Sequence, residues 1–462
     1  MSRGQRGATS RPADRTQDPR ALAWRILQRV EVGGAYADSL LGRTLNTGGL
    51  APRDRALLTR LVYGTLAWQG YLDHILAKFC RRPPAELDAP LYTLLRLALF
   101  QICLLTRVPP FAAVNTAVEL AKSVRGGAGA GLVNAVLRRA ASGWRGVPFP
   151  SRQDHPIDYL SLRLSHPRWL VERWVVRYGI DETEVLLRAN NESAATVVRV
   201  NPLSCTPAQL LADCAVADVG AEPCRYSPNG IRLTGSGTPE ALPGYAAGQF
   251  SLQGEASQLV GLVLAPKPGE RVLDLCAAPG GKATHLAELM GNQGHVTAVD
   301  TNARGVDRLR RMAHRLGLSI LHPAVADAAT WEPPEMPFDR ILVDAPCSGL
   351  GTLRQHPEIK WRRKPEDLTS LAVLQRALLW RSAMWVRPGG IVVYATCTLS
   401  SDENEQVVRD FLGQHSTFVI DDARPCVPAA ARELVGDDGV LRTFPHRHGM
   451  DGFFAVRLKA RG

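Results

Sequence analysis

Two cysteines stand where a thiol could do chemistry, because each follows an apolar run that predicts a strand instead of lying inside it. Cys347 follows the run at 339–343, and Cys397 follows the run at 391–395. We therefore expect both at the carboxyl ends of neighbouring strands. A cysteine inside a hydrophobic segment usually serves as inert core filling. We apply that interpretation to five others: Cys80, Cys103, Cys205, Cys214 and Cys224.

The stretch 272–282, VLDLCAAPGGK, has the pattern of a cofactor site. Its first four residues predict a short buried parallel strand, 277–281 the turn after it, and 283–290 a helix. In such a site small residues let the backbone approach a ligand, and unpaired N–H groups point at it. Asp300 closes a second short strand, where its carboxylate could hold two ribose hydroxyls.

Two phosphate-binding motifs compete with this interpretation, and the spacing fits neither. A Walker loop needs glycine where Cys276 stands and Ser or Thr where Ala283 stands. The dinucleotide pattern G-x-G-x-x-G is absent here as well. The sequence thus favours a ligand with a ribose and no phosphate, such as S-adenosylmethionine, over a nucleoside triphosphate or NAD.

A thiol beside a methyl donor suggests methylation of a pyrimidine carbon. Carbon 5 is a poor nucleophile until a thiolate adds to carbon 6, and a base must later remove the carbon 5 proton. Asp344 could hydrogen-bond the cytosine edge and assist charge build-up at the ring nitrogen. Methyltransferases acting on amino groups carry Asn or Asp before Pro-Pro-Tyr here, whereas this chain has Asp-Ala-Pro-Cys. This difference favours carbon methylation.

Composition sets the broad class. The chain has 462 residues, 45% of them hydrophobic, which indicates two or three domains with ample core. No apolar run reaches the roughly 18 residues of a membrane span, and the N-terminus lacks the apolar segment of a secretory signal. The nine cysteines show no C-x-x-C spacing, so we expect a reducing, cytoplasmic compartment and no metal site. The net charge of +11 favours a polyanionic partner.

Hydrophobic periodicity then divides the chain. Residues 1–20 read as a disordered basic tail, and 21–145 repeat apolar residues at helical spacing, which predicts an all-helical bundle. Residues 154–247 predict a small α+β connecting unit. Its Arg188, Arg199 and Arg225 either face RNA or are simply solvated. Strands and helices alternate over 248–462, which predicts a mostly parallel sheet covered on both faces, with the motifs where strands end.

Five motifs together resemble the RsmB (Sun/Fmu) family of ribosomal RNA cytosine-C5 methyltransferases. They are GQFSLQGEASQLV at 248, DLCAAPGGKATHL at 274, DAPCSGLGTLRQHPEIKW at 344, YATCTLSSDENEQVV at 394 and DGFFAVRLK at 451. Segments 114–122 and 132–139 resemble the closing helices of NusB, an RNA-binding transcription factor. The resemblance implies a NusB-like RNA-binding bundle, a connecting unit and a Rossmann-like class I methyltransferase domain with a mostly parallel seven-stranded sheet.

The same resemblance implies roles for particular residues. Cys397 would be the nucleophile, Cys347 the group for product release, Asp344 the residue orienting cytosine, and Lys282 a further catalytic residue. Reasoning from the residues alone leaves the choice between the two thiols open, since the comparable DNA enzymes attack with the Pro-Cys thiol. The implied S-adenosylmethionine contacts are Cys276, Ala277, Ala278, Pro279, Gly280, Gly281, Lys282, Asp300, Asp327 and Asp344.

The chain departs from the family pattern at two places. Gly254-Glu255 replaces a usual Asp-Glu, and Arg354-Gln355-His356 varies a more basic stretch, which puts a phosphate contact in doubt. A competing hypothesis is an RNA-binding or antitermination protein whose second half only holds RNA. A decayed enzyme should have lost a thiol or an acidic ligand, and all are present. We therefore expect an enzyme whose substrate is 16S ribosomal RNA. We also expect a monomer without a membrane partner.

Overall fold

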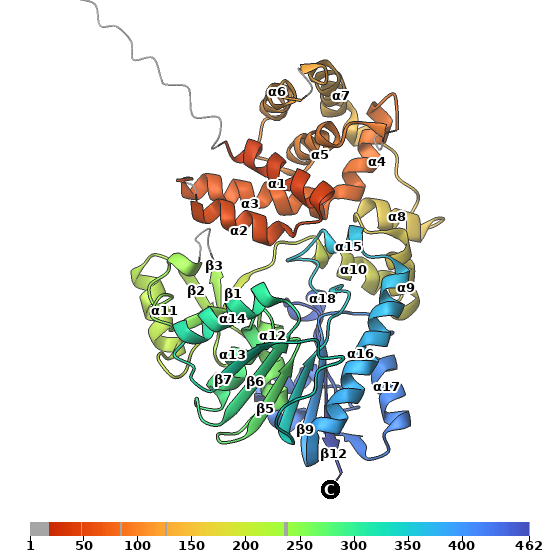
Figure 1. Cartoon of the computed structure of the whole chain (residues 1–462). Helices are drawn as coiled ribbons and strands as arrows, with labels where there is room; N and C mark the ends of the chain where they lie inside the picture. Colours follow the sequence, from red (N-terminus) through yellow and green to blue (C-terminus); the bar gives the residue numbers. More distant parts are fainter. Residues whose placement is uncertain (1–17, 48, 84–85, 125–126, 235–238, 462) are drawn as a thin grey trace, which may run out of the picture. The chain divides into compact units, whose positions relative to one another are not determined.

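The computed structural model describes residues 18–47, 49–83, 86–124, 127–234 and 239–461 (Figure 1). The expected basic tail falls mostly on residues 1–17, which lie outside this range, and the first helix already begins at Pro19. The chain divides into two compact units, Met1–Arg168 and Trp169–Gly462. In the described part of the chain no helix is long and apolar enough to cross a membrane.

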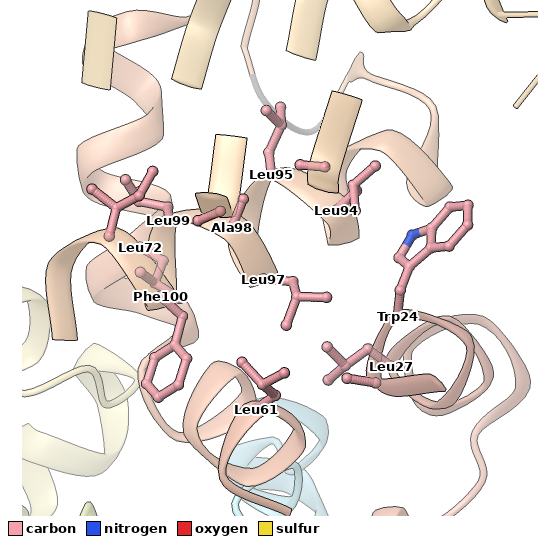
Figure 2. Packing of buried hydrophobic residues seen from close by; sticks show 14 of the residues in the cluster. Trp24, Leu27, Leu61, Leu72, Leu94, Leu95, Leu97, Ala98, Leu99 and Phe100 are labelled. Atoms are coloured by element: carbon pink, nitrogen blue, oxygen red, sulfur yellow. The ribbon is translucent and has the colours of Figure 1, made fainter. Parts of the chain in front are cut away.

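The first unit is helical, as predicted. Its helices are α1 (Pro19–Gly33), α2 (Ala37–Thr47), α3 (Pro52–Ala67), α4 (Gln69–Phe79), α5 (Ala89–Leu104), α6 (Pro110–Ala121), α7 (Ala130–Gly143) and α8 (Pro156–Arg163), with a 3-10 turn at Trp144–Gly146. Helix α5 forms the centre, because residues all round it, such as Leu94, Leu97 and Leu99, are almost fully buried. Trp24, Leu27, Leu61 and Leu72 from α1, α3 and α4 belong to the same hydrophobic cluster (Figure 2). A helix apolar on all sides belongs in the core of a bundle.

The second unit opens with two helices and a small antiparallel sheet. The helices are α9 (Arg168–Tyr178) and α10 (Ile180–Asn190), and the sheet has the order β2 (Gly220–Pro223), β3 (Gly230–Thr234), β1 (Thr196–Val200) and β4 (Phe250–Leu252). Helix α11 (Pro207–Val216) covers one face, where Val198, Val200 and Leu210 form a buried cluster. Strand β4 lies beyond residues 154–247, the bounds that the sequence predicted for the small α+β unit.

A large mixed sheet follows. Its strand order is β10 (Phe418–Ile420), β12 (Phe454–Ala460), β9 (Val386–Thr396), β8 (Phe338–Asp344), β5 (Arg271–Leu275), β6 (His295–Asp300) and β7 (Leu321–Val325), and β11 (Leu441–Arg442) adds a short eighth strand on β12. The pairs from β9 through β7 are parallel, and β12 is antiparallel to β9 and β10. The Rossmann-like, mostly parallel sheet is therefore confirmed.

Helices cover both faces of this sheet, because its strands are apolar on both sides. Val272 packs in the cluster of α12 (Glu255–Leu264), α13 (Gly281–Leu289) and α14 (Ala303–Arg315). Its neighbour Leu273 packs in the cluster of α16 (Pro365–Trp385) and α17 (Glu405–Gln414). Short helices complete the unit: α15 (Ile359–Arg362), α18 (Pro445–His448) and 3-10 turns at Pro239–Ala241, Arg424–Cys426 and Ala429–Leu434.

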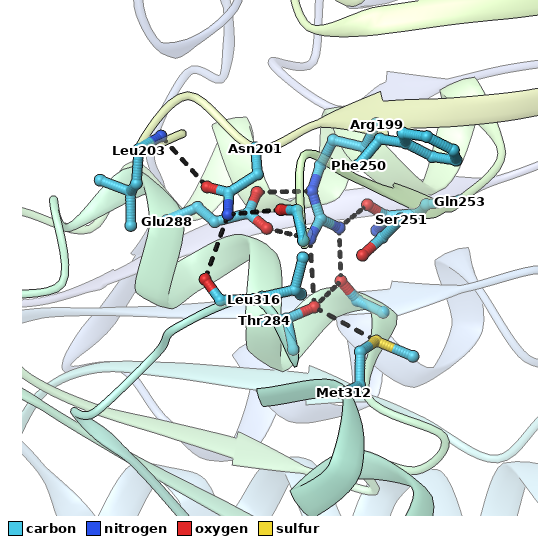
Figure 3. A network of polar contacts seen from close by, with 12 residues as sticks. Arg199, Asn201, Leu203, Phe250, Ser251, Gln253, Thr284, Glu288, Met312 and Leu316 are labelled. Carbon is cyan, nitrogen blue, oxygen red and sulfur yellow. Dashed lines mark hydrogen bonds and ion pairs between the residues drawn. The ribbon is translucent and has the colours of Figure 1, made fainter. Parts of the chain in front are cut away.

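One sequence expectation is wrong: Arg199 does not face RNA. Its side chain is fully buried, donating from Nε and Nη2 to the Glu288 carboxylate at 2.7 Å each and from Nη1 to the Gly281 carbonyl at 2.7 Å (Figure 3). Side chains alternate between the two faces of a strand. Arg199 therefore points away from the cluster formed by Val198, Val200 and Leu210, and toward helix α13. Arg188 and Arg225 are exposed, and they pair with Glu184 and Glu433.

Candidate active site

Parallel strands β5, β6, β7 and β8 end at one edge of the sheet, and the candidate site lies there. Asp300 ends β6, and its carboxylate accepts hydrogen bonds from two loops. Its Oδ2 accepts from the Ala278 N–H at 2.9 Å, and its Oδ1 accepts from the Asn302 N–H at 2.7 Å. A carboxylate offers about four lone-pair sites, so Asp300 retains capacity to accept from ribose hydroxyls.

The turn after β5 requires its glycine. Gly280 has φ 114°, and a Cβ there would lie 2.5 Å from Leu309 Cδ1. Gly281, which begins α13, differs, because a Cβ on it would meet only Gln253 at 3.9 Å or more. A methyl group at Gly281 would therefore make only ordinary van der Waals contact, and the turn before the helix contains small residues such as Ala277 and Ala278. These features fit a cofactor held against backbone N–H groups.

Asp327 lies at the end of the next strand along the edge. It follows β7, is exposed, and accepts from the Ala329 N–H at 2.9 Å through Oδ1. The adjacent Ala326 N–H donates to the Asp300 carbonyl at 3.1 Å. The two carboxylates that the sequence singled out, Asp300 and Asp327, therefore belong to neighbouring strand ends.

Lys282 and Asp344 connect the cofactor turn to the end of β8. Lys282 Nζ donates to Asp344 Oδ2 at 2.7 Å and lies 5.2 Å from the centre of the Phe453 ring. Burial acts to lower the pKa of Lys282, but the Asp344 carboxylate outweighs it and the pKa is raised. The Cys397 sulfur also contributes to that rise. A stable ammonium group therefore stands beside both Asp344 and Cys397.

The two thiols that sequence analysis singled out face each other. Cys347 Sγ and Cys397 Sγ are 3.2 Å apart, and both side chains are half-buried. The hydrogen bond with Cys397, followed by burial, raises the pKa of Cys347 well above its usual range. Either sulfur could be the donor of this contact, and the raised pKa favours the protonated form of Cys347.

A buried carboxylate that sequence reasoning missed accepts hydrogen bonds from the residues that follow the two cysteines. Glu403 is fully buried and accepts from the Ser348 N–H at 2.7 Å, from Ser348 Oγ at 2.5 Å and from Thr398 Oγ1 at 3.3 Å. Ser348 follows Cys347, and Thr398 follows Cys397. Burial raises the pKa of Glu403 despite these donors. Its only sequence signal was its place in the motif beginning at Tyr394.

A second missed carboxylate is Asp274, within β5. It is fully buried, and neither carboxylate oxygen has a hydrogen-bond partner among the described residues. Burial, then the nearby Asp344, raises the pKa of Asp274 well above its usual range, against the opposing effect of Lys282. A carboxylate inside an apolar strand was the available signal. Among the described residues no cluster of His, Cys, Asp and Glu could hold a metal ion.

The second unit has a Rossmann-like fold, and one edge of its sheet carries two adjacent thiols, a carboxylate and a lysine. Together these features define a Rossmann-like methyltransferase domain. The sequence matches the family model described as 16S rRNA methyltransferase RsmB/F over residues 261–459. It also matches the NusB family model over 17–142 and the RsmF/B-like ferredoxin-like domain model over 166–238. The chain belongs to the RsmB/F family of 16S rRNA methyltransferases, which confirms the resemblance seen in the motifs.

Individual relatives agree over nearly the whole length. The chain is 38% identical to a Bacillus subtilis protein named "Probable ribosomal RNA small subunit methyltransferase B", over 96% of this chain and 99% of the relative. It is 35% identical to ribosomal RNA small subunit methyltransferase B of Pseudomonas putida, over 96% and 98%. Among solved structures, PH0851 is similar with a TM-score of 0.82 and 28% identity, over 97% of this chain and 99% of that one.

Proposed function

We propose that this protein transfers a methyl group from S-adenosylmethionine to carbon 5 of a cytosine in small-subunit ribosomal RNA, through a covalent bond between Cys397 and the base. The observation that carries the proposal is the pair of half-buried thiols 3.2 Å apart at the strand ends, with Lys282 and Asp344 beside them. The names of its relatives support ribosomal RNA as the substrate.

The residues that would hold the cofactor are the 276–282 turn, Asp300 and Asp327. Bound there, S-adenosylmethionine supplies an electrophilic methyl group. The small residues of this turn and the spare lone pairs of Asp300 support this placement. Asp300 would accept from the ribose hydroxyls, and Asp327 would contact the adenine side.

Cys397 is the better nucleophile of the two thiols. A thiolate is favoured by a neighbouring cation and by a hydrogen-bond donor. Lys282 lies close enough to Cys397 for the two to interact electrostatically, and the Cys347 thiol, 3.2 Å away, would donate to the Cys397 sulfur. The Cys397 thiolate would add to carbon 6 of cytosine, which makes carbon 5 electron-rich enough to take the methyl group.

Asp344 would position the ring for that attack. Its Oδ2 accepts from Lys282, and no hydrogen bond of the described residues engages Oδ1. Oδ1 could therefore accept from the cytosine amino group. The paired ammonium and carboxylate would also balance the charge that develops on the ring during attack.

Cys347 would act at product release. Its raised pKa stems first from the hydrogen bond with Cys397. Once the Cys397 sulfur is bonded to carbon 6, that cause disappears and Cys347 can lose its proton to solvent more easily. Its thiolate would then take the proton from carbon 5, the bond between carbon 6 and Cys397 would break, and the aromatic ring would be restored.

The proposal is tested by incubating the protein with S-adenosylmethionine labelled in the methyl group and with small-subunit ribosomal RNA, followed by digestion to nucleosides. Label should appear in 5-methylcytosine. Label on an exocyclic amine or on ribose would reject carbon 5 as the target. RNA binding without any label would favour the competing hypothesis of a non-catalytic RNA-binding protein.

A further inference from the structure

We propose that Arg304, Arg308 and Arg311 on helix α14 form a contact surface for the RNA phosphate backbone outside the catalytic pocket. The inference rests on the proposed function, since it takes RNA as the substrate. The three side chains recur at i, i+4 and i+7, and the α-helix turns about 100° per residue. They therefore lie within about 60° of one another around the axis, and all three are exposed. We call these three residues the arginine stripe.

The helix that carries the stripe is firmly anchored on its other side. Val306, Leu309 and Ala313 are buried against the sheet. The Asn302 side chain caps the N-terminus by accepting from the Gly305 N–H at 3.1 Å. At the far end, Arg315 Nη1 donates to the carbonyls of Tyr245 at 2.6 Å and Phe250 at 3.0 Å. The stripe is thus presented outward by a rigid element.

The stripe also differs electrostatically from most arginines of this unit. Most arginines of the second unit pair with a carboxylate, as Arg188, Arg232 and Arg387 do with Glu184, Glu222 and Asp339. On α14 itself, Arg310 pairs with Asp307 at 2.8 Å. No ion pair within the described residues engages Arg304, Arg308 or Arg311. Their charge is therefore available to an external anion.

The helix dipole and the neighbouring like charges disfavour the positive charge of the stripe until an anion binds. Arg304 lies in the first turn of α14, where the helix dipole already presents positive charge, and Arg304 and Arg308 are like charges at i, i+4. The helix also begins close to the site, because its first residue follows Asp300 by three positions. Neighbouring strands are about 4.8 Å apart, so the β6 end lies roughly 10 Å from the β8 end. RNA whose target base reaches Asp344 can therefore extend over the stripe.

The test compares two triple variants of the full-length protein that lose the same net charge. One is Arg304→Ala, Arg308→Ala and Arg311→Ala. The control is Arg188→Ala, Arg232→Ala and Arg387→Ala, which removes exposed arginines that are already paired. The affinity for a single-stranded ribosomal RNA fragment is measured without cofactor at several salt concentrations. Alanine is the best helix former, so α14 should persist.

Each phosphate contact contributes about 0.7 to the slope of log affinity against log salt for a single strand. Loss of the stripe should therefore reduce the slope by about 2 and weaken binding roughly tenfold or more at 0.15 M salt. The control should bind like the wild type. Equal slopes and affinities in the two triple variants would overturn the proposal.

A lysine version, Arg304→Lys, Arg308→Lys and Arg311→Lys, retains the charges and should retain the slope. If the alanine variant folds poorly, the lysine version still tests the proposal. A lysine version with the reduced slope would also contradict a phosphate-binding role. RNA binding is measured apart from methylation. A wild type that binds RNA through the stripe yet yields no 5-methylcytosine would reject the proposed reaction and leave this surface standing.

Discussion

Lys282 Nζ lies 2.7 Å from Asp344 Oδ2, and this contact joins the first turn of α13 to the end of β8. The cofactor turn and the strand end that carries Asp344 and leads to Cys347 are thereby held as one structure. Because the pKa of Lys282 is raised, with Asp344 outweighing burial, the ammonium persists through neutral and moderately alkaline pH.

Replacement of Lys282 tests whether this charge assists the nucleophile. Lys282→Gln should lower kcat by about 10²- to 10³-fold, the range seen when one preorganised electrostatic contact is removed. Lys282→Arg should recover part of the rate, because it restores the positive charge. An unchanged kcat in Lys282→Gln would contradict the role given to Lys282.

Gly281 offers a direct probe of the cofactor site. A Cβ at this position would make only van der Waals contact with Gln253, at 3.9 Å, so Gly281→Ala should fold normally. The methyl group would occupy the proposed cofactor position, and binding of S-adenosylmethionine measured by calorimetry should weaken at least about tenfold. Gly413→Ala, in α17 with nothing within 4 Å of an added Cβ, is the control. Unchanged affinity in Gly281→Ala would place the cofactor elsewhere.

Sequence reasoning worked where pattern and position carry the information. Helical spacing predicted the bundle, and cysteines placed just after apolar runs, Cys347 and Cys397, do meet at strand ends. Sequence reasoning failed where the surroundings of a residue come from segments far away in the sequence. Arg199 looks like any arginine on a strand, and only the docking of α13 buries it against Glu288. Glu403 acts on Ser348, 55 positions away, so no local spacing could assign it.

Glu403 should prove to be a positioning residue for both thiols. Glu403→Gln keeps the shape of the side chain. It replaces a carboxylate oxygen, which accepts from Ser348, with an amide group that donates. Buried groups are then left unpaired, which costs about 1–3 kcal/mol of stability. We expect kcat to fall about 10- to 100-fold because the thiols lose their alignment. Cofactor affinity should be unchanged. A loss of stability alone, with normal kcat in the folded fraction, would reduce Glu403 to a structural role.

Asp274 should make stability depend on pH. Because burial raises its pKa, the folded state binds this proton more tightly than the unfolded state does. The stabilisation is full below about pH 4, the usual aspartate pKa. It then declines by up to about 1.4 kcal/mol per pH unit until the folded-state pKa is passed. Asp274→Asn should lack this decline between pH 5 and 8 in denaturant unfolding. Parallel curves for wild type and variant would show that Asp274 does not titrate as described.

The two thiols give the most direct measurement of the central claim. Cys347→Ala should still attack and methylate, because Cys397 and Lys282 remain, but it lacks the group that removes the carbon 5 proton. Incubated with ribosomal RNA and S-adenosylmethionine, it should accumulate a protein–RNA complex that survives a denaturing gel. Cys397→Ala should form no such complex and no 5-methylcytosine. A covalent complex in Cys397→Ala and none in Cys347→Ala would reverse the roles, and the absence of a complex in both variants would contradict release by Cys347.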